Sequence, residues 1–304
     1  MGGGREARGV TAPETARHAV PNSSGTAPPA LKAPAHSADC HIHIYDPRFA
    51  PPVDRVSNGA VPDYRLLQQR IGVSRVVIVQ PRNYATDNSV TLDAIAQLGI
   101  ANARGVAVIR PSVTDAELKT LDAGGVRGIR FTTGNPSTAV VSADMIEPLA
   151  GRIAALGWHV QLNMPAEQIV DNAALLGRLP TQIVFDHMGQ PPLPAGIQHP
   201  SHRIIRDLID RRRAWVKISG AYMNTQIGPP GYADAAPIAQ AFVKAAPERC
   251  VWGSDWPHPT EQSKQLPDDA LLFDLLLDWV PDEKVRQRVL VDNPAVLYDF
   301  PKQG

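Results

Sequence analysis

Cysteine is scarce in this sequence of 304 residues, which contains only Cys40 and Cys250 and no C-x-x-C pair. This scarcity excludes a disulfide framework and a zinc site built from thiolates. An excess of one charge is also lacking, because 30 Lys and Arg residues balance 30 Asp and Glu residues. No net field therefore favours nucleic acid or an anionic membrane surface as a partner. We expect a cytoplasmic protein without nucleic-acid or membrane partners.

Long apolar runs are missing as well. The stretches 76–79 and 271–277 are too short, or are interrupted by Asp274, and cannot span a membrane. The first 38 residues are rich in Gly, Ala, Pro and Ser and lack the apolar segment of a secretory signal. We predict a flexible N-terminal leader over 1–38, with a remnant transit sequence as the alternative, and a single domain over 39–304.

From residue 39 onward, short β-branched runs alternate with longer amphipathic stretches, as in βα units. The predicted strands are 39–44, 75–80, 105–109, 126–131, 159–164, 182–186, 215–219 and 250–253. The predicted helices are 63–71, 89–98, 114–121, 145–156, 166–179, 203–212, 235–245, 268–280 and 283–290. Eight such units predict an α/β fold, a single-domain (β/α)₈ TIM barrel. The alternative is an open doubly wound sheet, but no G-x-G-x-x-G follows the first strand.

Titratable side chains stand where three of the predicted strands end. In a βα barrel the catalytic groups gather at the carboxyl ends of the strands. His41 and His43 end the first strand, and residues two apart on a strand face the same side. A closed barrel places the first and eighth strands side by side, so Asp255 faces both histidines. Imidazoles can hold a metal ion or polarise a carbonyl, and a carboxylate can activate water. The predicted catalytic residues are His41, His43, His187 and Asp255.

Each of these residues also has an ordinary explanation. An H-x-H pair occurs by chance, His187 could be a hydrogen-bonded core histidine, and Asp255 before Trp256 could form a turn. The combination favours a function, because only nine histidines exist and three of them fall at strand ends together with an aspartate. The rival interpretation is a barrel without activity that serves in binding or scaffolding.

Several motifs together resemble the amidohydrolase superfamily, in particular its lactone-processing branch, which includes 2-pyrone-4,6-dicarboxylate lactonase and D-galactarolactone isomerase. The resemblance runs from about residue 39 to residue 300. It implies the barrel fold and an enzyme that acts on a lactone, and it places the four predicted catalytic residues on the family's active-site positions. The motifs are 39–43, 87–88, 127–131, 186–189 and 252–258.

The metal content that this resemblance implies is open. Binuclear members need a bridging Lys or Glu on strand four and a histidine on strand five. Here strand four ends with Arg130, His159 stands at the start of strand five, and Asn163 takes the place near the mouth. An amide is a poor ligand for a transition metal, which disfavours a two-metal site. Because the branch includes enzymes without a metal, we expect no obligatory cofactor. One Zn or Mn ion, held by His41, His43 and Asp255, remains the alternative.

Polar residues around this core are candidates for substrate contact. In the metal-free interpretation, Arg130 and the histidines polarise the lactone carbonyl while Asp255 acts as general base on water. Arg130 can bind a carboxylate with two hydrogen bonds, or it can form a salt bridge at the rim. Lys217 lies inside a predicted strand, where an unpaired charge is costly, so it needs a partner or a role. The predicted substrate-binding residues are Arg130, Arg82, Asn88, Asn163, Lys217, Tyr222 and His258.

The sequence departs from the pyrone-dicarboxylate pattern at two positions. Gln190 and Met223 stand where that pattern has arginines, so a dicarboxylate substrate would lose two of the side chains that bind its carboxylates. The stretches 217–222 and 232–234 are closer to the isomerase. We predict a hydrolase that opens a small carboxylated lactone, of sugar-acid or pyrone type, by general-base activation of water. The alternatives are an intramolecular lactone isomerase on the same residues and a metal-dependent decarboxylase. The oligomeric state stays open.

Overall fold

The computed structural model describes residues 19–49, 58–135, 139–262 and 264–301. Eight parallel strands follow one another in chain order around one sheet. Asp255 N donates to His41 O and His43 N donates to Trp256 O, both at 2.8 Å, so the loop after the last strand is joined to the first strand. This closure confirms the TIM barrel and excludes the open doubly wound sheet. The strands are β1 (Ala38–Ile42), β2 (Arg75–Val79), β3 (Ala103–Ala107), β4 (Val126–Thr132), β5 (His159–Asn163), β6 (Ile183–Phe185), β7 (Ala214–Ile218) and β8 (Cys250–Trp252).

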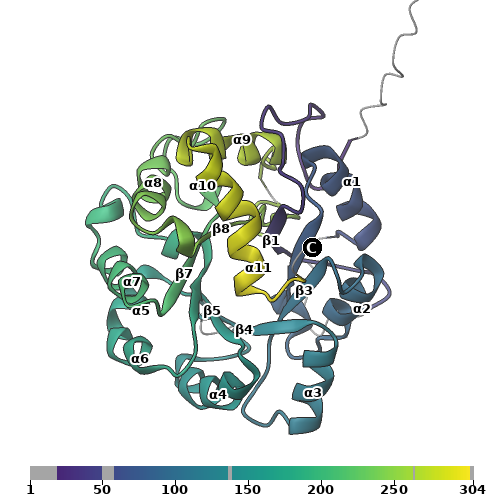
Figure 1. The fold of residues 1–304 in the computed structure, drawn as a ribbon, viewed down its shortest axis with the longest axis vertical. Coiled ribbons are helices and arrows are strands. Elements are labelled where there is room, and N and C mark those ends of the chain that lie inside the picture. The colour runs from purple at the N-terminus through teal and green to yellow at the C-terminus, as the bar shows by residue number, and fades with distance from the viewer. Residues whose placement is uncertain (1–18, 50–57, 136–138, 263, 302–304) are drawn as a thin grey trace, which may run out of the picture.

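Helices surround the barrel (Figure 1). A capping box at Thr114 begins one of them, since its Oγ accepts a hydrogen bond from Glu117 N at 3.2 Å. The single helix predicted over 166–179 is wrong: it divides at Asn172, whose amide donates to Gln168 O and competes with the backbone ladder. The helices are α1 (Val61–Ile71), α2 (Ser89–Leu98), α3 (Asp115–Ala123), α4 (Ile146–Ile153), α5 (Ala166–Asp171), α6 (Ala173–Arg178), α7 (Pro200–Asp210), α8 (Ala236–Ala245), α9 (Asp269–Trp279), α10 (Glu283–Gln287) and α11 (Asn293–Leu297).

The C-terminal segment fills one end of the barrel. Tyr298 and Phe300, which follow α11, pack in an inner apolar cluster with residues such as Ala38 at the start of β1. The guanidinium groups of Arg75 and Arg104, at the starts of β2 and β3, lie 5.2 and 5.0 Å from the centre of the Phe300 ring. The segment therefore closes the end at which the strands begin, and α11 lies over it in Figure 1.

Part of the predicted leader lies against the barrel. Trp256 Nε1 donates to Pro21 O at 2.8 Å, and the backbone N–H groups of Ala30 and Leu31 donate to Asp274 of α9. Val20 is buried. Residues 1–18 lie outside the described residues, and the division of the chain at residue 38 stays a prediction. Among the described residues, no helix is long and apolar enough to cross a membrane.

Candidate active site

The two histidines of β1 owe their direction to an irregular strand. The register between β1 and β2 shifts between Asp39 and Ile42, and such irregularities re-aim side chains next to active sites. His41 and His43 both turn toward Asp255 inside the barrel, while Ile42 packs in the outer core. Gly253 of the neighbouring strand end has to be a glycine, because a Cβ there would stand 2.6 Å from the Cβ of His41. The close approach of these two strands therefore sets the position of His41.

The four predicted catalytic residues meet at one carboxylate oxygen. Asp255 Oδ1 lies 3.4 Å from His41 Nε2, 3.4 Å from His43 Nε2 and 3.8 Å from His187 Nε2, and all four side chains are buried. Burial opposes the charge on Asp255, but the surrounding histidines hold the pKa of its carboxyl well below the usual range. Burial and the nearby Lys217 lower the pKa of His41. The structure thus brings the set together, and its catalytic role stays a prediction.

The Nδ1 atom of each of these three rings points away from Asp255 and contacts another residue of the barrel. Since Val79 O can only accept, His43 Nδ1 donates to it at 2.8 Å. His41 Nδ1 lies 3.3 Å from Asp186 Oδ1, and His187 Nδ1 lies 3.0 Å from Ser219 Oγ. Within the part of the chain that the structure describes, neither His41 Nε2 nor Asp255 Oδ1 has a hydrogen-bond partner. Buried polar atoms that face one another in this way suit a cation, a water molecule or a substrate group between them.

One divalent metal ion fits this donor set. In a tetrahedral zinc site, bonds of about 2.0–2.1 Å place ligand atoms roughly 3.3 Å apart. His41, His187 and Asp255 offer atoms within 4.8 Å of one another. The sequence predicted His43 rather than His187 as the second imidazole, and both reach the same oxygen. His159 lies at the closed end, its ring 5.3 Å from that of Tyr298, so it cannot complete a second metal site at the mouth.

Asp186 anchors a buried network beneath these residues. It accepts hydrogen bonds from Arg130 Nε at 3.0 Å and from Gln161 Nε2 at 3.1 Å. Lys217, which has no exposed surface, lies 3.5 Å from Asp186 Oδ1 and donates to Gln161 Oε1 and Cys40 O at 2.9 Å. Burial opposes the charge on Asp186, but His41 and Lys217 hold the pKa of that carboxyl well below the usual range.

This network involves two of the predicted substrate-binding residues, whose contact with substrate stays a prediction. Arg130 holds the carboxylate of Asp186, as in the salt-bridge alternative, although its side chain also lines a small pocket beside Arg82. Lys217 is completely buried and has the partner that a buried charge requires. Sequence reasoning missed the role of Asp186. The available signal was its place directly before His187 at the end of a strand.

Tyr222 is the predicted substrate-binding residue that does reach Asp255. Its hydroxyl donates to Asp255 Oδ2 at 2.6 Å. His258 lies behind it: His258 Nδ1 is 3.1 Å from the tyrosine oxygen, and His258 Nε2 is 3.1 Å from Asp269 Oδ2. His258 has no exposed surface, and its predicted contact with substrate stays a prediction. Sequence reasoning missed Asp269, which begins α9.

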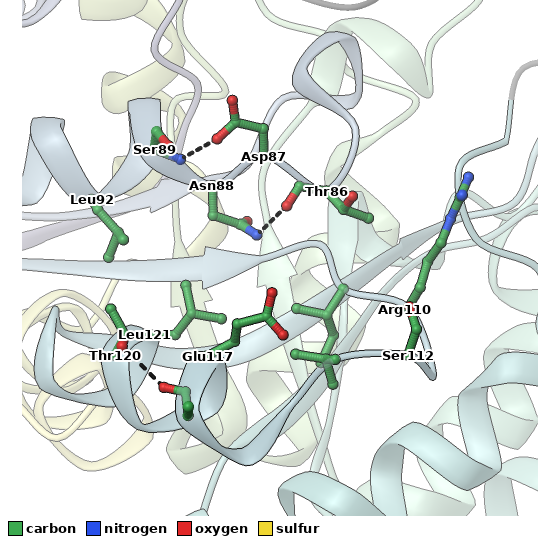
Figure 2. A pocket seen from close by; sticks show the side chains of 13 residues that line it. Thr86, Asp87, Asn88, Ser89, Leu92, Arg110, Ser112, Glu117, Thr120 and Leu121 are labelled. Atoms are coloured by element: carbon green, nitrogen blue, oxygen red, sulfur yellow. Dashed lines mark hydrogen bonds between the residues drawn. The ribbon is translucent and has the colours of Figure 1, made fainter.

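The two predicted asparagines serve the structure of the loops. Asn88 accepts from Val108 N and donates to Val108 O, both at 2.9 Å, which fixes the chain after β3. Figure 2 shows Asn88 with its amide toward Thr86, at a groove between α2 and α3. Asn163 accepts from Gln190 Nε2 at 2.8 Å at the ends of β5 and β6.

The loops that carry the site hold unusual backbone. Non-glycine residues rarely adopt a left-handed conformation, and sparsely populated conformations cost about 1–3 kcal/mol each unless the surrounding structure enforces them. Such residues cluster in the loops after β6 and β8. They are His187 (φ 49°), Met188 (60°), Gln190 (44°), Asp255 (64°) and His258 (58°).

A family described as amidohydrolase matches residues 38–300. The chain belongs to the amidohydrolase family. It is 34% identical to a 2-pyrone-4,6-dicarboxylate hydrolase of Comamonas testosteroni, over 89% of this chain and 92% of that protein. It is also 34% identical to a D-galactarolactone isomerase of Agrobacterium fabrum, over 90% and 94%. A crystal structure of an Agrobacterium tumefaciens protein in its apo form superimposes with a TM-score of 0.82, at 31% identity over 93% of this chain and 99% of that one. The resemblance found in the sequence is therefore confirmed.

Proposed function

We propose that this amidohydrolase opens a small carboxylated lactone, of sugar-acid or pyrone type, by general-base activation of water. The observation that carries the proposal is the geometry at Asp255, whose Oδ1 faces three imidazole nitrogens within 3.8 Å while Oδ2 is held by Tyr222. The relatives named for lactone hydrolysis and lactone isomerisation support this class of substrate.

The chain's own groups supply the steps of a hydrolysis. Asp255 accepts a proton from water as the water oxygen attacks the lactone carbonyl carbon. Negative charge then develops on the carbonyl oxygen, which Arg130 and the histidines stabilise. When the ring C–O bond breaks, the leaving oxygen takes the proton back from Asp255, and the product is an open hydroxy acid. Arg130 and Arg82, which share one small pocket, bind the carboxylate of the substrate.

A metal is optional in this proposal. If a divalent ion occupies the donor set of His41, His187 and Asp255, it supplies Lewis-acid polarisation of the carbonyl and acidifies a bound water. Tyr222 and Asp186 lie outside that donor set. Tyr222 can therefore orient Asp255, and the network around Asp186 can stay in place, with or without a metal.

Intramolecular isomerisation is the second candidate. In that reaction a hydroxyl of the substrate replaces water as the nucleophile, while the same groups polarise the carbonyl. Gln190 and Met223 in place of the expected arginines, together with the isomerase among the relatives, favour a sugar-acid lactone over a dicarboxylate. We propose a cytoplasmic protein, in keeping with two buried free cysteines, and a small-molecule lactone as its partner.

The test is turnover of a panel of sugar-acid lactones and pyrone carboxylates by purified protein of measured metal content, with and without chelator. Product analysis by NMR separates an opened acid from a new lactone. Ring opening that persists in metal-free protein is the expected result. Activity that disappears with the metal would make His41, His187 and Asp255 obligatory ligands, and no turnover of any lactone would overturn the proposal.

A further inference from the structure

Behind Asp255, away from the histidine cluster, three polar side chains form a continuous chain of hydrogen bonds. Tyr222 OH lies 2.6 Å from Asp255 Oδ2, His258 Nδ1 lies 3.1 Å from Tyr222 OH, and Asp269 Oδ2 lies 3.1 Å from His258 Nε2. His258 and Asp269 have no exposed surface. The chain connects the loop after β7, the loop after β8 and the first residue of α9.

The proton positions in this chain follow from which atoms can donate. An ionised carboxylate only accepts, so the single proton of Tyr222 points to Asp255. The oxygen of Tyr222 then accepts from His258 Nδ1–H. Asp269 accepts from His258 Nε2–H, so this arrangement requires a proton on both ring nitrogens of His258. Burial opposes this charge, but Asp269 outweighs burial and raises the pKa of His258.

We infer that His258 and Asp269 are positioning residues that orient the carboxylate of Asp255 through the hydroxyl of Tyr222. The inference rests on the proposed role of Asp255 as the base. A carboxylate can rotate about its Cβ–Cγ bond, and a donor fixed on Oδ2 leaves Oδ1 toward the histidines and the attacking water. Preorganised geometry of this kind lowers the barrier without any contact between His258 and substrate.

Tyr222 needs such an anchor because one side of it is open. Its side chain also lines a groove between the loops after β7 and β8, together with Glu261 and Lys264. Water or substrate in that groove competes for the hydroxyl. His258 donates from the buried side, and its own backbone stands in the left-handed conformation at φ 58°, which the loop has to enforce. The burial of His258 and the use of both its nitrogens argue for positioning rather than substrate binding.

The test is a double-mutant cycle in the full-length protein, with Tyr222→Phe and His258→Gln, on a lactone that the wild type opens. We expect each single variant to lower kcat by roughly 10-fold or more, with KM within about twofold, because an interaction made in the transition state is lost. We expect the double variant to be no slower than Tyr222→Phe alone, because His258 acts through Tyr222. His258→Asn, whose amide nitrogen stands near the place of Nδ1, should retain more kcat than His258→Gln.

Tyr298→Phe is the matched control, a buried tyrosine at the closed end whose hydroxyl has no hydrogen-bond partner among the described residues. Its kcat should stay unchanged. Additive losses in the cycle would overturn the inference. If the wild type opens no lactone, the proposed function fails, and ¹⁵N NMR of the ring of His258 still decides the proton arrangement. Two ring N–H signals at neutral pH that vanish in His258→Gln are expected, and a single one would overturn it.

Discussion

The two ends of the barrel both enclose buried polar atoms that lack hydrogen-bond partners within the described residues, but they arrange them differently. At the mouth, His41 Nε2 and Asp255 Oδ1 face each other at 3.4 Å. At the closed end, His159 Nε2 and Tyr298 OH belong to rings that pack against each other. A lone unsatisfied atom is thus a weak sign of function, whereas convergence of several such atoms on one point is a strong one.

The two ends also differ in the amount of left-handed backbone. Five left-handed non-glycine residues lie in the loops after β6 and β8, whereas the closed end is filled by an apolar cluster in which Asp299, at φ 53°, stands between Tyr298 and Phe300. Strained backbone lowers stability and apolar burial raises it. The comparison predicts that substitutions at the mouth change the rate of reaction, and that substitutions at the closed end change the free energy of unfolding.

Asp255→Asn is expected to have the largest effect. It removes the proposed base, and loss of general-base catalysis costs about 10²–10⁴-fold in kcat. The midpoint of thermal unfolding should change little, since the amide still accepts from Tyr222. Steady-state kinetics and calorimetry measure both quantities, with the exposed Asp171→Asn as control. A variant that keeps its kcat but unfolds at a much lower temperature would assign Asp255 a purely structural role and break the comparison.

Phe300→Ala tests the closed end. The ring is 3% exposed, and its removal from a core costs about 3–5 kcal/mol of unfolding free energy. Below the unfolding temperature kcat should remain near the wild-type value, because the residue lies at the starts of the strands. Chemical denaturation and kinetics at a low temperature check these outcomes. A large fall in kcat without a loss of stability would show that the two ends are coupled.

The sequence could predict the mouth because strand ends are local features. Closure of the barrel alone brings these residues together, since each lies within three residues of the end of its strand: His41, His43, His187 and Asp255. The partners of buried charges could not be predicted in this way, because the pairing of Lys217 with Asp186 depends on how neighbouring strands lie side by side.

Exposure was equally inaccessible to sequence reasoning. His258 was predicted to contact substrate, and only the packing of α9 shows that Asp269 holds it inside the protein. The prediction of a flexible leader rests on composition alone, and composition cannot predict a long-range hydrogen bond such as that from Ala30 N to Asp274. Local sequence patterns therefore predict which residues come together in the fold, and tertiary packing determines which of their side chains are exposed to solvent.

A buried carboxyl group on β1, that of Asp39, should make the stability of the fold depend on pH. Asp39 accepts hydrogen bonds from His41 N at 3.2 Å and from Ser254 N at 2.9 Å, and so joins the strand ends that carry the site. Burial raises the pKa of Asp39 to about 7 despite these donors.

Because the folded state then holds a proton that the unfolded state has lost, stability falls as the pH rises from about 4 toward about 7. The slope from this group is at most about 1.4 kcal/mol per pH unit. Asp39→Asn should flatten that slope, as measured by urea unfolding of both proteins between those pH values. Parallel curves for the two proteins would mean that Asp39 is ionised throughout.

Ser219→Ala is expected to have the smallest effect. It removes the oxygen that lies 3.0 Å from His187 Nδ1, a neutral hydrogen bond that contributes about 1 kcal/mol. The His187 ring keeps its place against the His41 ring, whose centre lies 4.7 Å away, but loses the partner that defines its tautomer. We therefore expect a fall in kcat of several-fold and a loss of stability of about 1 kcal/mol, measured side by side. A loss of stability without a fall in kcat would mean that Ser219 only supports the fold.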